Sequence, residues 1–170
     1  GDKNYNILMN TFGLKTQNPG IYTNFINSGL VDGLLIIAPP VESHFFQDLK
    51  AGTIPYVLVS HQVNDKNVCF VDCLNTQGII DTVEHLMSLG HKKMAYISGN
   101  NEYPKNSLDR LNAYKYIMKK KGLPYKEEMV YTGDFTPISG AKAVDAFLKL
   151  KVRPTAIIAC DDAMAIGAIK

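Results

Sequence analysis

The chain has 170 residues, of which 46% are hydrophobic and 20% charged, as in globular proteins that bury a core. Its 18 basic and 16 acidic residues nearly balance, which neither requires nor excludes nucleic acid as a partner. No apolar run approaches the roughly 18 residues of a membrane span, and no signal-peptide pattern begins the sequence, so we expect no membrane partner.

The first half of the sequence alternates short apolar runs, typical of strands, with amphipathic stretches, typical of helices. Strands are predicted over residues 5–11, 34–38, 56–60 and 68–72. Helices are predicted over residues 18–29, from Ser43 to a stop at Gly52, and over residues 76–89. Pro19 suits the first position of the first helix, and Gly90 ends the third.

The second half repeats this alternation. Strands are predicted over residues 93–98, 129–132 and 155–160, and helices over residues 107–121, from Thr136 onward and from Ala163 onward. Ser107 is placed at the cap of its helix, and Gly122 closes that helix. The apolar residues expected to face the sheet are Leu111, Tyr114, Ile117 and Met118 on one helix and Val144, Phe147 and Leu148 on the next.

Alternation of strand and helix from end to end predicts an α/β fold with parallel sheets and helices on both sheet faces. We divide the chain into two subdomains between Gly90 and His91, residues 1–90 and residues 91–170, because the long helix ends there and a new strand follows.

Polar residues follow the predicted strand 155–160 directly. Asp161 and Asp162 stand between this strand and a helix, which places them at the carboxyl edge of the sheet, where ligands bind in open α/β folds. The alternative is that they only cap the helix, and only one carboxylate can take the capping position.

Arg110 is the most informative side chain in the second half. If Ser107 caps its helix, Arg110 lies in the first turn, where a cation is disfavoured by a few tenths of a kcal/mol. A guanidinium in such a place indicates an anionic or hydroxyl-rich partner, because it presents a rigid fork of donors. The alternative is a surface arginine on a helix that begins elsewhere.

Four further residues lie near predicted strand ends or helix starts. Phe135 follows a strand, and its ring can stack on a ligand or equally fill the core. Asn106, Asn75 and Gln77 are polar candidates for ligand contact, or ordinary loop and cap residues.

No catalytic pattern is present. The sequence lacks a nucleophile elbow, a phosphate-binding loop and a dinucleotide fingerprint, so we expect no catalytic residues, no cofactor and no enzyme activity. Three cysteines without a C-x-x-C pair indicate reduced thiols in a cytoplasmic protein, and neither they nor the scattered histidines predict a metal site.

Taken together, five segments resemble the effector-binding domain of the LacI/GalR family of bacterial transcription regulators. They are Val31-Asp32-Gly33-Leu34, Ile54-Pro55-Tyr56-Val57, Glu84-His85-Leu86 with Gly90-His91-Lys92, Gly133-Asp134-Phe135, and Pro154-Thr155-Ala156 with Asp162-Ala163-Met164-Ala165-Ile166-Gly167-Ala168. Their order and spacing match the family over nearly the whole chain.

The resemblance implies two Rossmann-like subdomains of the periplasmic-binding-protein type, with a small effector between them. It implies that Arg110 and Phe135 contact the effector, that Asp161 hydrogen-bonds it where Asn is commoner, and that Asn106 adds a polar contact. Leu74 departs from the family, since many members carry a carboxylate there, so a relative's sugar cannot be carried over to this chain.

The resemblance also predicts partners. We expect a sugar, a sugar phosphate or a nucleobase as effector, a homodimer in the intact protein, and operator DNA bound through a head domain that this chain lacks. The family's first strand and helix and its last strands are also missing, so we expect a fragment with incomplete subdomains. The alternative function is an extracytoplasmic sugar-binding protein of a transport system.

Overall fold

A computed structural model describes residues 6–10, 26, 28–37, 39, 43–100 and 105–170. The chain forms two compact units, Gly1–Val71 and Asp72–Lys170. This division falls before the helix that follows residue 71, whereas the predicted subdomain boundary between Gly90 and His91 lies after it; that boundary remains a prediction.

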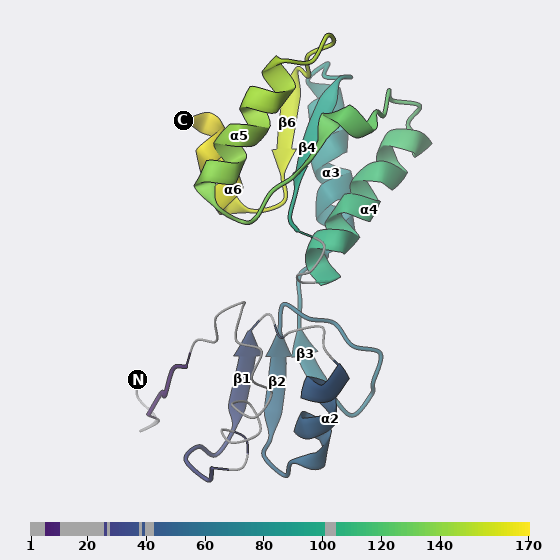
Figure 1. The fold of residues 1–170 in the computed structure, drawn as a ribbon. Coiled ribbons are helices and arrows are strands. Elements are labelled where there is room, and N and C mark those ends of the chain that lie inside the picture. Colours follow the sequence, from purple (N-terminus) through teal and green to yellow (C-terminus); the bar gives the residue numbers. More distant parts are fainter. Residues whose placement is uncertain (1–5, 11–25, 27, 38, 40–42, 101–104) are drawn as a thin grey trace. The chain divides into compact units, whose positions relative to one another are not determined.

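The first unit contains a three-stranded parallel sheet, β1 (Leu34–Ile37), β2 (Tyr56–Val59) and β3 (Cys69–Val71), in the order β1-β2-β3 (Figure 1). Helix α2 (Ser43–Ala51) connects β1 to β2. Ile26, Leu49 and Leu58 are buried together and form the centre of its core. Leu35 and Ile37 alternate with the residues of β1 that pack on this core, and both are largely exposed.

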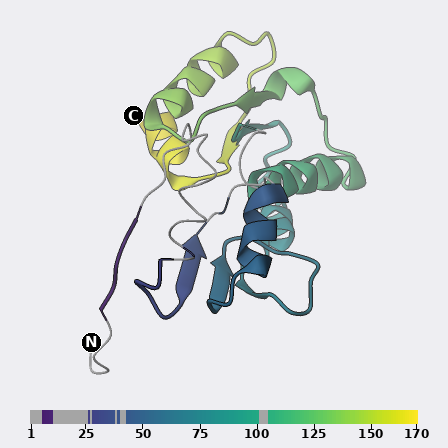
Figure 2. The same cartoon turned by 60° about the horizontal axis from the view of Figure 1, so that its bottom comes forward.

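The second unit has a parallel sheet in the order β5-β4-β6, with β4 (Met94–Ser98) at its centre. Helices α3 (Asn75–Ser88) and α4 (Lys105–Lys120) lie on one side of it. Helices α5 (Pro137–Leu148) and α6 (Asp162–Ile169) lie side by side on the other (Figures 1 and 2). The short helix η1 (Glu127–Met129) leads into β5 (Val130–Thr132), and β6 is Ala156–Ala159.

All five residues of β4 are buried because helices cover both faces of the sheet. Tyr96 stacks on Tyr114 of α4 with ring centroids 4.8 Å apart, and the Tyr114 hydroxyl donates a hydrogen bond of 2.9 Å to the Met94 carbonyl. Burial raises the pKa of both phenols above its ordinary value. The central strand is therefore fixed to α4 by aromatic packing and one buried hydrogen bond.

The predicted helix ends are confirmed. Gly90 follows α3 with a φ of +88°, and Gly122 follows α4 with a φ of +64°. This left-handed conformation is accessible to glycine without strain, and it lets the backbone N–H groups after the helix reach its last carbonyls.

Helices α5 and α6 approach each other backbone to backbone. A Cβ atom added to Gly140 would lie 2.0 Å from the Met164 carbonyl oxygen, and one added to Gly167 would lie 1.8 Å from the Pro137 carbonyl oxygen. Only glycine fits at these two positions, so the sequence fixes how closely the two helices pack.

Most predicted strands and helices are present within one or two residues, and the parallel α/β class is confirmed. One predicted strand and one predicted core residue are wrong. Residues 6–10 form no strand, and Ile7 and Met9 are exposed, because no described strand pairs with them. Leu148 is exposed at the end of α5, while Phe147 is buried. Most of the helix predicted over residues 18–29 lies outside the described residues. Ile26 is helical and buried, whereas residues 28 and 29 have no helical structure.

Candidate functional site

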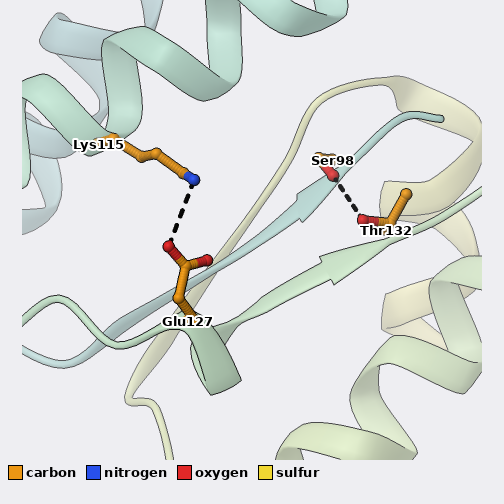
Figure 3. Close-up of polar contacts among 4 residues, drawn as sticks. All are labelled: Ser98, Lys115, Glu127 and Thr132. Atoms are coloured by element: carbon orange, nitrogen blue, oxygen red, sulfur yellow. Dashed lines mark hydrogen bonds and ion pairs between the residues drawn. The ribbon is translucent and has the colours of Figure 1, made fainter. Parts of the chain in front are cut away.

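The carboxyl ends of the strands in the second unit carry most of the candidate residues. Ser98 ends β4 and Thr132 ends β5, and the Ser98 hydroxyl lies 3.5 Å from Thr132 Oγ1 (Figure 3). The Tyr131 carbonyl, 3.4 Å away, is a second acceptor for the same proton. Cys160 follows β6 and donates its backbone N–H to the Ile97 carbonyl. Three neighbouring strands thus end at a common edge, as the sequence predicted.

Arg110 lies on α4 and reaches this edge. The predicted position in the first turn is wrong, because the helix already begins at Lys105 and Ser107 lies inside it. Instead of capping the helix, the Ser107 hydroxyl accepts a hydrogen bond of 3.1 Å from the Gly99 backbone N–H and so ties the end of β4 to α4.

The Arg110 guanidinium is held by uncharged acceptors. Nε donates to Asn75 Oδ1 at 2.7 Å, Nη1 donates to the Cys160 carbonyl, and Nη2 lies 3.8 Å from Cys73 Sγ. In the described part of the chain, no carboxylate forms an ion pair with it. Arginine carries five N–H donors, and with Cys73 Sγ counted as the third partner, two of them have no partner among the described residues. A partly buried cation with neutral partners can hold an oxygen-rich molecule.

Asn75 is fixed as firmly as the arginine that it contacts. It opens α3, and its Nδ2 donates to the Cys73 carbonyl at 3.2 Å and to Asp72 Oδ1 at 3.3 Å. Asn106 on α4 is buried and donates to the same oxygen of Asp72 at 3.3 Å. The structure therefore brings Arg110, Asn75 and Asn106 together, as their selection from the sequence implied.

Asp72 also belongs to this group, although it was not among the residues predicted from the sequence. One carboxylate oxygen accepts hydrogen bonds from the Cys73 backbone and from both asparagine amides. A signal was present, because Asp72 is a polar residue at the carboxyl end of a predicted strand, the same criterion that selected Asp161. Cys73 was also missed, and its thiol lies 3.3 Å from Asn75 Oδ1.

Asp161 caps α6: its Oδ1 accepts a hydrogen bond of 2.9 Å from the Met164 backbone N–H, so the predicted capping position is taken by Asp161, and its ligand contact remains a prediction. It also follows Cys160, whose carbonyl binds Arg110, so its carboxyl group stands at the same edge. Burial raises the pKa of the Cys160 thiol, and a hydrogen bond with Ser107 opposes this rise. Asp162 is exposed in the first turn of α6.

Phe135 follows β5 and has a φ of +63°, a conformation that is uncommon for residues other than glycine. The residue is partly buried against the core of the second unit, and Cζ and Cε1 of its ring lie beside Gly99. The residue is packed against the core but only partly buried, so core packing and ligand contact are not exclusive.

Gln77 lies apart from these residues. It is exposed on α3, and its amide donates a hydrogen bond of 2.7 Å to Asp81, one helical turn later. This contact is that of an ordinary helix surface, so the structure does not join Gln77 to the other candidates.

A hollow of about 250 Å³ lies beside β5, lined by Asn100, Tyr131, Thr132, Gly133, Asp134, Ser139 and Lys142. Hydrogen bonds from Thr136 and Ser139 hold the pKa of the Asp134 carboxyl below its ordinary value.

On α4, Lys115 pairs with Glu127 at 3.5 Å (Figure 3), a surface ion pair of small energetic value.

Among the described residues, no group of three or more histidine, cysteine or acidic side chains could hold a metal ion. The three cysteines are free thiols, as predicted. In the same part of the chain, no helix is long and apolar enough to cross a membrane.

Comparison with known proteins gives a consistent result. The model of the periplasmic binding protein-like domain family matches residues 83–170. Catabolite control protein A of Priestia megaterium is 31% identical over 168 residues, which are 97% of this chain and 50% of that protein.

Solved structures agree with this match. A regulatory protein of the LacI family from Chloroflexus aggregans is 29% identical with a TM-score of 0.79, covering 93% of this chain and 57% of that one. A transcriptional regulator, CelR, in complex with cellobiose is 26% identical with a TM-score of 0.77, covering 89% of this chain and 46% of that one. The chain spans about half the length of these relatives.

Proposed function

The chain belongs to the family of periplasmic binding protein-like domains carried by LacI-type transcriptional regulators, and we propose that it is the effector-sensing core of a cytoplasmic bacterial regulator. The observation that carries this proposal is the Arg110 group, a guanidinium held at the carboxyl edge by Asn75, the Cys160 carbonyl and Cys73 Sγ, with two of its five N–H donors unpaired among the described residues. The named relatives are regulators, which favours this function over a transport-binding protein.

The chemistry of the edge supports a hydroxyl-rich effector, a sugar or a sugar derivative. Arg110 donates to oxygen atoms, whereas the carboxylate of Asp161 accepts from hydroxyl groups through the oxygen that the helix cap leaves unused. Phe135 offers part of an aromatic ring to an apolar face of the ligand, as sugar rings and nucleobases both present. Asn75 positions the arginine by accepting from its Nε, whereas Asn106 is linked to Asn75 only through Asp72, to which both amides donate; both asparagines remain candidates for a polar contact with the ligand. We place Gln77 outside this set because of its pairing on the surface of α3.

Sensing requires no covalent chemistry. An effector that binds one conformation of the protein more tightly than another shifts the population toward the first. In the intact protein, which we propose to be a homodimer, this shift changes the fraction that is competent to bind operator DNA through a head domain outside these 170 residues.

A thermal-shift screen of the 170-residue chain tests the proposal. Its four probes are glucose, cellobiose, glucose 6-phosphate and adenine, which cover a neutral monosaccharide, a disaccharide, an anionic sugar and a nucleobase. A probe at 100 times its dissociation constant adds about 2.7 kcal/mol to the stability of the folded state, which raises the melting temperature by several degrees. Failure of all four probes to shift it at 10 mM would contradict the proposed ligand class.

A further inference from the structure

The ring of Phe135 occupies space that exists only because residue 99 is glycine. A Cβ atom added to Gly99 would lie 2.1 Å from Cζ and 2.5 Å from Cε1 of this ring, far inside van der Waals contact. It would also lie 2.7 Å from Ser107 Oγ. Phe135 and Gly99 come from loops after different strands, β5 and β4, so their fit is a feature of the assembled edge and not of one loop.

The backbone on either side of Phe135 is fixed. Asp134 Oδ1 accepts hydrogen bonds from the Thr136 backbone at 3.2 Å and from the Thr136 hydroxyl at 2.6 Å, while the Asp134 N–H donates to Ser139 Oγ at 3.2 Å. Thr136 in turn caps α5. Because the backbone is held in a left-handed conformation by these contacts, the ring cannot retreat by a simple shift of its own loop.

The other side of the contact is fixed to the helix that carries Arg110. Ser107 of α4 is buried and accepts the hydrogen bond from the Gly99 N–H. Gly99 therefore holds a constant position relative to α4, and a ring that rests on Gly99 holds a constant position relative to the guanidinium.

We propose that Gly99 is a positioning residue of the effector site. Because Gly99 has no side chain, the Phe135 ring can pack directly against its backbone, and this packing sets where the ring meets the ligand. This inference rests on the proposed function, because it assigns Gly99 a role in the same site. Gly99 itself need not touch the effector. Effector affinity thus depends on a residue with no functional group.

The first test needs no effector. In the 170-residue chain labelled with ¹⁵N and ¹³C, the ring placed over Gly99 shifts the Gly99 Hα resonances away from their random-coil values by its ring current. The variant Phe135→Leu keeps an apolar side chain without a ring current, so the Gly99 Hα resonances should move back by at least several tenths of a ppm. Unchanged resonances would show that the ring does not rest on Gly99 and would overturn the inference.

The second test measures affinity by calorimetry with cellobiose, or with another of the four probes if that one gives the larger thermal shift. Phe135→Ala is expected to weaken binding about three- to ten-fold, the range for an aromatic contact. Gly99→Ala should weaken binding to a similar extent, because the added Cβ displaces the ring. The double variant should bind the probe about as tightly as the single variant of lower affinity, because both changes act on the same ring contact. Binding of Gly99→Ala at wild-type affinity, or additive losses, would overturn the inference.

Two controls separate this inference from its premise. Gly78→Ala, a glycine with nothing within 4 Å of an added Cβ, should bind the probe as the parent chain does. Arg110→Ala reports on the proposed function. If Arg110→Ala weakens binding while Gly99→Ala does not, the result supports the effector site and contradicts the role proposed for Gly99. If Gly99→Ala does not fold, the resonance comparison between the parent chain and Phe135→Leu still decides the matter.

Discussion

Replacement of Gly167 by alanine should destabilise the second unit through the contact between α5 and α6. The new Cβ would lie 1.8 Å from the carbonyl oxygen, 2.5 Å from the carbonyl carbon and 2.7 Å from Cα of Pro137. All three are backbone atoms, so no side chain can rotate away to make room. The helices must separate by more than about 1 Å, which opens the tight packing along their whole contact.

The size of the effect follows from two opposing contributions. Overpacking of this kind costs about 1–3 kcal/mol, and a backbone clash belongs at the upper end of that range. Alanine gains about 1 kcal/mol over glycine in helix propensity, which offsets part of the loss. The net free energy of unfolding should fall by about 2 kcal/mol. Gly78→Ala in α3 is the matched control, since an added Cβ there meets nothing within 4 Å and should raise stability by about 0.5–1 kcal/mol.

Urea denaturation followed by far-ultraviolet circular dichroism and tyrosine fluorescence measures both variants, and the chain contains nine tyrosines and no tryptophan. Both glycines lie in the second unit, so the same transition reports on both. With a slope of about 1–3 kcal/mol per molar, the two midpoints should differ by about 1 M or more. If Gly167→Ala unfolds at the same or higher urea concentration as Gly78→Ala, the close approach of α5 and α6 is refuted.

Three further predictions concern side chains of the second unit. Tyr114→Phe removes the hydrogen bond to the Met94 carbonyl and should lower the free energy of unfolding, measured with urea, by about 0.5–1.5 kcal/mol. Tyr96→Phe should leave it almost unchanged, because the Tyr96 hydroxyl has no hydrogen-bond partner among the described residues. Burial raises the pKa of both phenols in the folded state, so the unfolded chain loses these protons first as the pH rises. The free energy of unfolding should therefore fall above about pH 10. Between pH 8 and pH 11, the urea midpoint should fall less in either phenylalanine variant than in the parent chain. Asp161→Ala should lower the free energy of unfolding by about 0.5–2 kcal/mol, because the cap on the Met164 N–H is lost. Asp161→Asn keeps an acceptor, so its free energy of unfolding should stay within about 0.5 kcal/mol of the parent chain. Equal losses for the two variants in urea denaturation would contradict the capping role.

Local rules predicted much of this fold. The apolar run 93–98 identified β4, and Gly90 and Gly122 identified the ends of α3 and α4, because these signals depend on neighbours along the chain. The likeness to regulators was also accessible from sequence, since it rested on segments spread over nearly the whole chain.

For other residues, the sequence pattern did not identify the partner that the structure shows. Ser107 has the residue type of a cap but binds Gly99, because α4 begins earlier than its polar residues suggested. Gln77 was selected for its place near a helix start, yet its partner lies on its own helix. Asp72 carried a sequence signal, its place at the carboxyl end of a predicted strand, but its asparagine partners on α3 and α4 could be identified only from tertiary contacts.

The central claim is that the guanidinium of Arg110 binds the effector, and calorimetry with the best of the four probes tests it most directly. Arg110→Ala should weaken binding ten-fold or more, because a hydrogen bond from a charged donor contributes about 1.5–3 kcal/mol. Lys119→Ala, which removes an exposed cation from the last turn of the same helix, should leave the affinity unchanged. Equal affinities of the parent chain and a folded Arg110→Ala variant would contradict the account.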